Sequence, residues 1–311
     1  MAARLPLSNR GVRGDRLLVF DALAVDRSLL RRNLRLAPFQ PATALWRTFE
    51  TGHILRTGAL PRDGRGVDLG CGDGGIMELL RDALDARWRL TGLDPDDGEL
   101  ALAATRGLYE RLEHAEGAST NAGEASFDFV FSNSVLEHVE ALEPTLEEVA
   151  RVLTDVGSFV FTVPSSFFHD NLGAPGLLGW LATGTRDLSE YRRAIDRRLA
   201  HLRYLSVEEW RAMLANAGLE LVQASLFMSR AETRRWAVLS NATAGVLVRL
   251  SGGKASPIEL QRRLGLRRRR PPGWLRLLAT VFVELAVLGL GRDEDGGERG
   301  SCLLVVARKR A

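Results

Sequence analysis

The amino-acid sequence predicts an α/β fold in which a largely parallel sheet is covered by helices on both faces. Short apolar runs alternate along the chain with segments whose apolar residues recur every three or four positions, the spacing typical of amphipathic helices. Several of the short runs are apolar throughout, as in strands buried on both sides. This alternation indicates parallel strands joined by helical crossovers.

The composition is that of an ordinary globular protein. The 311 residues include 42 Lys and Arg against 39 Asp and Glu, and 45% are hydrophobic, which excludes a largely disordered or fibrous chain. The two cysteines, Cys71 and Cys302, provide neither a disulfide framework nor a zinc-binding spacing. We therefore expect no metal site and an intracellular, cytoplasmic protein. No signal-peptide core follows the basic N-terminus, so secretion is not expected.

The first predicted strand begins at Gly66 and runs into a glycine-rich turn and a helix, GVDLGCGDGGIMELLRDAL. A second strand, WRLTGLDPDD, is expected to end at Asp94, where Pro95 stops it. A third apolar run, from Phe127 to Ser132, has the density of a strand covered on both faces. The helix after the turn is indicated by apolar residues that share one face, namely Ile76, Leu79, Leu80, Ala83 and Leu84.

The later elements follow the same alternation. Pro144 and Thr145 predict the start of a helix, and Glu148 would complete its capping box. The segment SFVFTVPS is then predicted to be a buried strand. A second capping box, Ser206 with Glu209, opens the helix VEEWRAMLANAG, and LELVQASLFM is the strand after it.

Chemistry is expected at the carboxyl ends of the strands, where open α/β sheets bind ligands. Gly70, Gly72 and Gly75 satisfy the G-x-G-x-x-G pattern of dinucleotide-binding proteins, so the turn alone leaves a dinucleotide-dependent oxidoreductase open. Two acids sharpen the prediction. Asp68 lies inside the first strand just before the glycines, and Asp94 ends the second strand.

These motifs together resemble the class I S-adenosylmethionine-dependent methyltransferases, within the small-molecule group that includes the ubiquinone and menaquinone methyltransferases. The resemblance implies a Rossmann-like fold with a mostly parallel seven-stranded sheet, and SCLLVVARKR near the C-terminus would be its antiparallel last strand. The segments that carry the resemblance are VDLGCGDGG at 67–75, LTGLDPDD at 90–97, FDFVFSNSVLEHV at 127–139 and LEEVARVLTDVGSFVFTVPS at 146–165.

The resemblance implies S-adenosylmethionine as the cosubstrate. Asp94 would accept hydrogen bonds from both ribose hydroxyls, and Asp68 would orient the methionine ammonium. This ligand has a diol and an ammonium but no phosphate, so carboxylates suit it better than bare backbone amides. The other implied contacts are Gly70, Cys71 and Gly72 in the turn, Glu116 or alternatively Pro95 and Asp96 at the adenine, and Ser132 where the transferable methyl should emerge.

Asn133 and His138 are the candidate catalytic residues, because they follow the strand beside which the methyl should emerge. An imidazole at His138 could deprotonate a hydroxyl or an enol. The alternative is a histidine bonded to backbone near the cofactor, since methyl transfer from a sulfonium can depend on proximity and alignment alone. The motif N-P-P-[YF] of amide and base methyltransferases is absent. His169 and His201 are expected to be structural or solvated.

We predict a helical cap segment at 1–60 and a methyltransferase domain at 61–311, with cap insertions at about 165–205 and 229–300. The second insertion separates the last two strands, which the family normally joins through a short hairpin. That hairpin opens at the carboxyl edge of the sheet. The insertions and the N-terminal segment are therefore expected to lie on the cofactor side, as a cap over the substrate.

The second insertion contains an arginine cluster and an apolar run at 274–291. Arg276 and Glu284 interrupt the run, which disfavours a membrane span. The last strand must also rejoin the sheet, so both ends of the run must lie on the same side of a bilayer, and this excludes a single span. Two alternatives stay open: an interfacial helix on an anionic membrane surface, and a buried cap helix beside a solvated turn. The clustered arginines are Arg262, Arg263, Arg267, Arg268, Arg269 and Arg270. Neither aromatic interleaving nor an RNA-binding motif supports a nucleic-acid partner.

The sequence thus predicts an enzyme that transfers a methyl group from S-adenosylmethionine to a small-molecule or lipid-linked acceptor, at oxygen in preference to carbon or nitrogen. Two alternatives come from other classes of protein. One is a dinucleotide-dependent oxidoreductase, and the other is a noncatalytic protein that binds S-adenosylmethionine.

Overall fold

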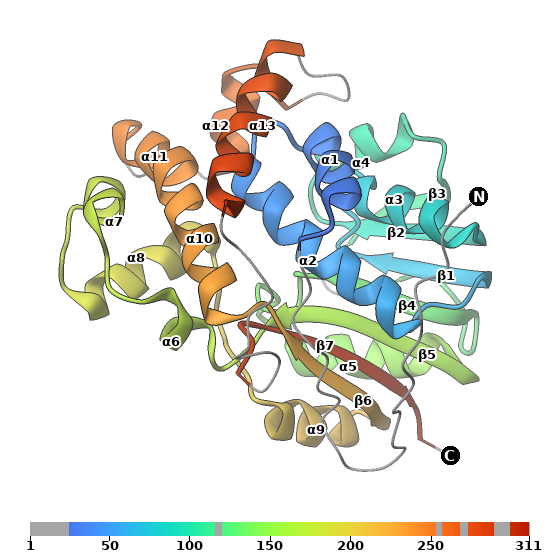
Figure 1. Ribbon diagram of the computed structural model, residues 1–311. Coiled ribbons are helices and arrows are strands. Elements are labelled where there is room, and N and C mark those ends of the chain that lie inside the picture. The colour runs from blue at the N-terminus through green and yellow to red at the C-terminus, as the bar shows by residue number, and fades with distance from the viewer. Residues whose placement is uncertain (1–24, 116–119, 253–256, 268–272, 289–298, 311) are drawn as a thin grey trace.

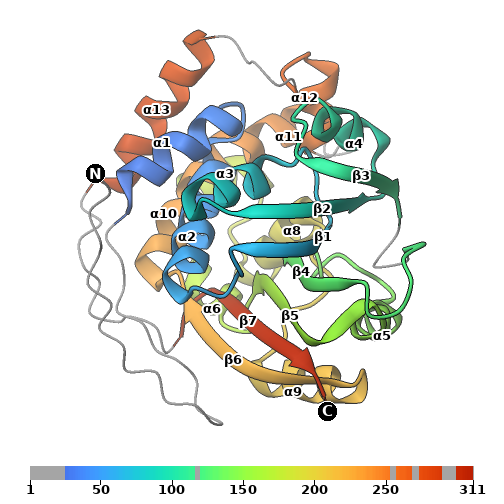
Figure 2. The same cartoon turned by 90° about the vertical axis from the view of Figure 1, so that its right-hand side faces the viewer.

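The computed structural model describes residues 25–115, 120–252, 257–267, 273–288 and 299–310. Its centre is a seven-stranded sheet with the strand order β3-β2-β1-β4-β5-β7-β6, which can be followed in Figure 2. The strands are β1 (Asp63–Leu69), β2 (Arg87–Asp94), β3 (Tyr109–His114), β4 (Phe127–Asn133), β5 (Leu153–Pro164), β6 (Leu219–Phe227) and β7 (Cys302–Lys309).

The pairing of the strands confirms the predicted mixed sheet. β1 to β5 pair in parallel, and β7 is antiparallel to both of its neighbours, β5 and β6. Within the sheet, Leu69 at the end of β1 is level with Leu93 on β2 and with Ser132 on β4. The carboxyl ends of these three strands therefore meet at one edge, where a parallel sheet binds ligands.

Helices cover both faces of the sheet (Figure 1). On one face, α1 (Arg27–Leu36), α2 (Pro41–Thr57) and α3 (Gly75–Leu84) contribute to one buried cluster. On the other face, α5 (Leu142–Val152) and α9 (Val207–Asn216) contribute to a second. The short helix α4 (Asp97–Ala104) contacts β2 and β3.

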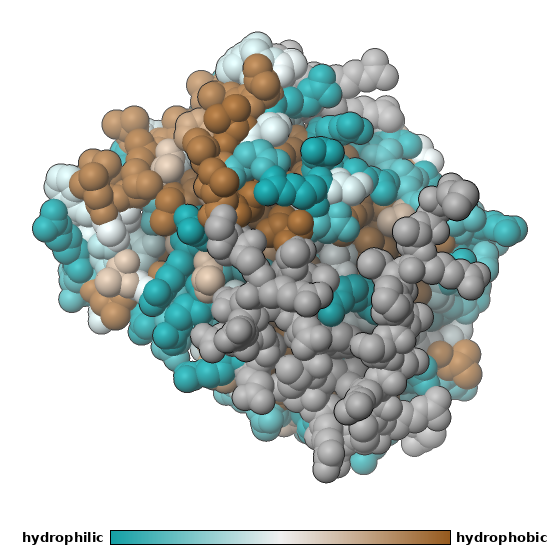
Figure 3. All heavy atoms as spheres, in the orientation of Figure 1, coloured by the Kyte–Doolittle hydropathy of each residue, from teal (hydrophilic) through white to brown (hydrophobic). Residues whose placement is uncertain are grey.

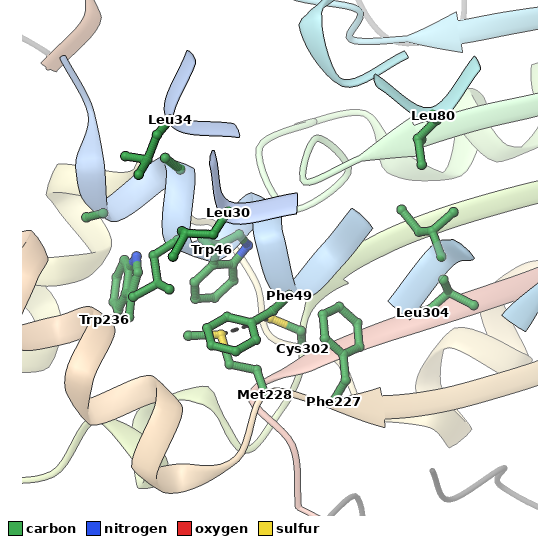
Figure 4. Close-up of a cluster of buried hydrophobic side chains, with 14 of the residues drawn as sticks. Leu30, Leu34, Trp46, Phe49, Leu80, Phe227, Met228, Trp236, Cys302 and Leu304 are labelled. Atoms are coloured by element: carbon green, nitrogen blue, oxygen red, sulfur yellow. Dashed lines mark hydrogen bonds between the residues drawn. The ribbon is translucent and has the colours of Figure 1, made fainter. Parts of the chain in front are cut away.

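The first cluster includes the large aromatic side chains shown in Figure 4. Trp46 from α2 and Trp236 from α10 (Arg230–Ser240) meet edge to face, with ring centroids 5.0 Å apart, a favoured geometry for aromatic pairs. Leu304 of β7 is fully buried in the same cluster. Helix α2 begins with Pro41 at its first turn and ends at Gly58, whose φ of 61° suits glycine.

Among the described residues of the two predicted insertions, helices of one insertion pack on helices of the other. Asn241 donates a hydrogen bond to the Tyr191 hydroxyl at 2.8 Å and accepts one from Arg198 at 3.1 Å, which joins the second insertion to the first. No helix in the described ranges is both long and apolar enough to cross a membrane. The remaining helices of the insertions are α6 (Phe168–Leu172), α7 (Leu177–Thr183), α8 (Leu188–Leu199), the π-helix η1 (Asn241–Gly245), α11 (Val246–Leu250), α12 (Pro257–Arg263) and α13 (Gly273–Val287).

The start of one helix was predicted wrongly. Helix α5 begins at Leu142, and Thr145 lies inside its first turns, where its hydroxyl donates to the carbonyl of Ala141 at 2.9 Å. Glu148 accepts from the backbone N–H of Thr120 instead of completing a capping box. The second predicted capping box, Ser206 with Glu209, is present on α9, so that prediction is confirmed.

Candidate active site

The glycine-rich turn after β1 is held against the end of β2. The N–H groups of Gly70 and Cys71 both donate to the carbonyl of Leu93, at 2.8 and 2.9 Å. Gly70 has a φ of 72°, and a Cβ at this position would lie 2.4 Å from the side chain of Val135. Glycine is therefore required at this position both by the backbone conformation and by the close approach of Val135.

Asp94 accepts two backbone hydrogen bonds at the end of β2. Its Oδ2 accepts from Gly72 N–H at 2.8 Å and its Oδ1 from Asp96 N–H at 2.9 Å. Burial raises the pKa of this carboxyl. The contacts fix the side chain at the strand end, next to the glycine turn, as the sequence predicts. The neighbouring Pro95 is exposed.

Asp68 is buried inside β1 and bonded to a tyrosine that the sequence did not indicate. The Tyr109 hydroxyl, from the edge strand β3, donates to Asp68 Oδ2 at 2.5 Å. Burial raises the pKa of Asp68 to about 7, although the tyrosine bond opposes this shift. The carboxyl of Asp68 is therefore poised to titrate near neutral pH, and an added cation would favour its ionised form.

A second residue that the sequence did not indicate, Glu50 of α2, lies at the carboxyl ends of β4 and β5. It is 1% exposed and accepts hydrogen bonds from Asn133 Nδ2 at 2.9 Å and from Arg47 at 3.0 Å. Ser134 and Thr162 donate to its other oxygen, at 2.5 and 3.1 Å. Glu50 therefore fixes the side chain of Asn133, one of the candidate catalytic residues.

The end of β4 brings two predicted residues to the strand ends. Ser132 is fully buried, and its hydroxyl donates to the carbonyl of Leu69 at 3.2 Å. This bond connects β4 to β1 just before the glycine turn. Asn133 Oδ1 is buried and has no hydrogen-bond partner among the described residues, so an acceptor atom is left over at this edge of the sheet.

His138 lies in the turn after β4, not in a helix. Its Nδ1 is 2.9 Å from the carbonyl of Ala200, so Nδ1 carries the proton and donates it. Its Nε2, with a free lone pair, is 3.9 Å from Glu137 Oε1. Burial lowers the pKa of His138, and the imidazole is neutral at physiological pH.

The insertion carrying the arginine cluster contacts the N-terminal end of α4, just after β2. Arg262 bonds Asp96 and Glu99 at 2.7 and 2.9 Å, and Arg267 Nε bonds Glu99 at 3.0 Å. Arg263 pairs with Glu259 on its own helix. Three of the clustered arginines are thus engaged with acids of this chain. Glu116 and Arg268, Arg269 and Arg270 lie outside the described residues.

The side chains at these strand ends fit S-adenosylmethionine. Two buried carboxylates, Asp68 and Asp94, lie at neighbouring strand ends beside a turn that has no side chain at Gly70 or Gly72. A ligand with an ammonium and a diol needs such acceptors. Burial raises the pKa of the Cys71 thiol, so Cys71 is a neutral neighbour of the turn and not a nucleophile.

Comparison with known proteins gives one matching family and several distant relatives. A family model described as a methyltransferase domain matches residues 46–224. The chain is 35% identical over 129 residues to the trans-aconitate 2-methyltransferase of Methylobacterium nodulans, covering 42% of this chain and 47% of that protein. It is 27% identical over 147 residues to the ubiquinone biosynthesis O-methyltransferase of Maricaulis maris, covering 43% of this chain and 55% of that protein. The chain thus spans about half the length of these relatives.

Two solved structures share the fold at low sequence identity. The [4+2]-cyclase SpnF has a TM-score of 0.51 and 16% identity, covering 95% of this chain and 100% of that one. The complex between the Haloferax volcanii Trm112 methyltransferase activator and a methyltransferase gives a TM-score of 0.51 and 17% identity, covering 92% and 100%. Because one of the two is named as a cyclase, the fold alone does not specify methyl transfer.

Proposed function

The chain belongs to the methyltransferase family whose model it matches over residues 46–224, and from this premise we propose that it transfers a methyl group from S-adenosylmethionine to an oxygen of a small-molecule or lipid-like acceptor. The observation that carries the proposal is the pair of buried acids, Asp68 and Asp94, beside the Gly70 turn. When bound, S-adenosylmethionine supplies an electrophilic methyl group on a sulfonium.

The residues of the turn and of the strand ends would hold this cosubstrate. Asp94 would accept hydrogen bonds from the ribose hydroxyls, and Asp68 in its ionised form would accept hydrogen bonds from the methionine ammonium. Gly72 leaves room for the ligand, since a Cβ at this position would meet only Glu99 Oε2, at 3.9 Å, and Gly70 allows the turn itself to form. The family match favours this arrangement over the dinucleotide-dependent oxidoreductase that the glycine pattern left open.

The acceptor is proposed to bind where β4 ends, under the cap formed by the two insertions. Asn133 is oriented by Glu50 and would position the acceptor. His138 would activate the acceptor hydroxyl through the lone pair on its Nε2, since its Nδ1 is engaged with Ala200. Transfer to oxygen is supported by the O-methyltransferases among the relatives, such as the one from Maricaulis maris.

Calorimetry with S-adenosylhomocysteine, in parallel with NAD and NADP, tests the cofactor assignment. We expect one-to-one binding of S-adenosylhomocysteine alone. Binding of a nicotinamide nucleotide in its place would refute the proposal. Transfer of a labelled methyl group to quinols or to tricarboxylates then distinguishes an enzyme from a noncatalytic cofactor-binding protein.

We also propose that the protein associates peripherally with membranes through one face of α13. On this face, apolar side chains are exposed to solvent: Trp274, Leu277, Leu278, Val281, Leu285 and Leu288. They recur at helical spacing, whereas Ala279, Val283 and Val287 on the other face are buried. Figure 3 shows apolar side chains gathered over α13 and α11. An exposed apolar stripe with a tryptophan is typical of interfacial helices.

Vesicle pelleting tests this surface. The triple variant Trp274→Ser, Leu277→Ser, Leu285→Ser should lose binding to vesicles of mixed neutral and anionic lipid. The matched control is Val156→Ser, which removes an exposed apolar side chain (87% exposed) from the start of β5. Absence of binding by the unaltered chain, or equal binding by the triple variant, would refute the membrane proposal.

A further inference from the structure

Three potential metal ligands from two separate segments meet beside the end of β4. Glu137 and His138 come from the turn after the strand, and His201 comes from the chain just after α8. Glu137 Oε1 lies 3.9 Å from His138 Nε2 and 4.0 Å from His201 Nε2. One ligand atom from each of the three residues lies within 4.8 Å of the others.

The partners of the two imidazoles leave both Nε2 atoms with a lone pair. His138 Nδ1 donates to the carbonyl of Ala200 at 2.9 Å. His201 Nδ1 lies 3.0 Å from the Tyr204 hydroxyl, which itself donates to Asp196 Oδ1 at 2.5 Å. Because the hydroxyl has one proton and gives it to Asp196, it accepts from His201 Nδ1–H. Outer partners of this kind fix the tautomer of metal-binding histidines.

The side chain of Glu137 provides an independent indication that this cluster binds a cation. Its side chain is 2% exposed, and its Oε2 accepts no hydrogen bond from any described residue. A buried carboxylate oxygen without a donor is costly. A cation bound by both oxygens of the carboxylate, together with the two imidazoles, would remove that cost.

We propose that Glu137, His138 and His201 bind a divalent transition-metal ion, for which Zn²⁺ and Co²⁺ are suitable probes. Two imidazoles and one carboxylate are a common ligand set for Zn²⁺ sites that keep an open coordination position. With bonds of about 2.1 Å, ligand atoms on one tetrahedral ion lie about 3.4 Å apart. Glu137 Oε1 must therefore approach each of the two Nε2 atoms by roughly 0.5 Å when the ion binds. His138 is 37% exposed and offers a path of entry.

Other contacts between the two segments hold the site together without the ion. Leu202 N–H donates to the carbonyl of Glu137 at 2.9 Å. Arg203 donates to the carbonyl of Leu136 at 3.1 Å and also contacts that of Val139. The ligands are therefore brought together by the fold, and binding should need little rearrangement. The sequence indicated no metal site, since His201 is distant from Glu137 and His138 along the chain and no ligand spacing joins the three residues.

The open coordination position suggests an acceptor class, and this step rests on the proposed function. A divalent ion lowers the pKa of a hydroxyl that it binds. Acceptors with two adjacent oxygens, such as catechols, would suit an ion with one or two free positions. With the ion bound, the Nε2 lone pair of His138 is a metal ligand, so His138 acts on the acceptor through the ion and not as the direct base described under the proposed function.

Titration of the full-length, tag-free and chelator-treated protein with Co²⁺ tests the site directly. We expect one equivalent to bind with visible absorption bands typical of histidine ligation, and Zn²⁺ to displace it. His201→Gln and Glu137→Gln should each weaken binding at least 100-fold. Tyr204→Phe, which removes only the outer partner of His201, should weaken it about tenfold. His114→Gln is the control, because His114 bonds Asp97 in a surface histidine–carboxylate pair elsewhere.

The outcomes separate the two proposals. If the folded wild-type protein binds no saturable equivalent of Co²⁺ or Zn²⁺, the metal site is refuted, whatever the variants do. The same holds if folded His201→Gln keeps the wild-type affinity. A spectrum unchanged by catechol refutes the acceptor class alone. Failure to bind S-adenosylhomocysteine refutes the proposed function and leaves the Co²⁺ result standing.

Discussion

Cofactor binding should release a proton from Asp68, because the free protein holds this carboxyl at a pKa of about 7 and an ammonium beside it favours ionisation. At pH 6 about nine-tenths of the molecules carry the protonated acid, and at pH 8 about one-tenth do. The dissociation constant for S-adenosylhomocysteine should therefore be about tenfold higher at pH 6 than at pH 8. Close to one proton should be released on binding at pH 6.

Calorimetry at pH 6, 7 and 8, in pairs of buffers with different ionisation enthalpies, measures both quantities. Asp68→Asn should bind more weakly and should lose the pH dependence and the buffer-dependent heat. Tyr109→Phe removes the hydrogen bond that lowers the pKa of Asp68, so its midpoint should move above that of the wild type. An affinity that stays flat from pH 6 to pH 8, with no proton released, would contradict the assignment of Asp68 to the ammonium.

Further predictions concern stability and binding. Asp68→Asn should stabilise the cofactor-free protein at pH 8 by up to about 4 kcal/mol. The raised pKa of Asp68 in the folded state lowers the free energy of unfolding of the wild type as pH rises from about 4 to 7, and the variant avoids this loss. In urea unfolding, the difference between variant and wild type should vanish in acid. Asp94→Asn should abolish S-adenosylhomocysteine binding with an unchanged circular dichroism spectrum, whereas the exposed control Asp85→Asn should bind normally. Glu50→Gln should lower the free energy of unfolding by about 2–3 kcal/mol, because it disrupts several charge-assisted bonds. Ser206→Ala should cost about 1 kcal/mol through the lost helix cap, and a loss near zero in urea unfolding would contradict the capping box.

The cofactor side of the molecule could be predicted from the sequence because its requirements are local. Gly70 is required by a positive φ and by the approach of Val135, and Asp68 and Asp94 follow from their places in two apolar strands. The antiparallel last strand was implied by the family resemblance that these motifs carry, and the pairing of β7 confirms it. The roles of Asp68 and Asp94 toward the ligand stay predictions.

Residues that act through distant contacts left no such signal. Strand β3 is an edge strand with a largely polar sequence, YERLEH, so its periodicity did not reveal it, and Tyr109 was missed with it. Glu50 lies in a helix that is buried on nearly every side, and its bonds reach Asn133 and Thr162 far along the chain. A buried acid in such a helix was the one available sign of a polar partner.

The arginine-rich insertion shows why charge patterns need their partners before they indicate a surface. Arg262 and Arg267 are bonded to Glu99, which is 4% exposed, so they bind the first turn of α4 instead of an external anion. A buried cap helix was one of the two alternatives for the apolar run that follows these arginines. In the structure this run forms α13, where Leu277 and Leu285 are 69% and 59% exposed. Membrane affinity should then come chiefly from apolar contact, because Arg262, Arg263 and Arg267 are already paired with acids of the chain itself. Binding to vesicles should therefore depend weakly on salt and on anionic lipid. A steep loss of vesicle binding between low and high salt would contradict this and would indicate that the arginines supply most of the affinity.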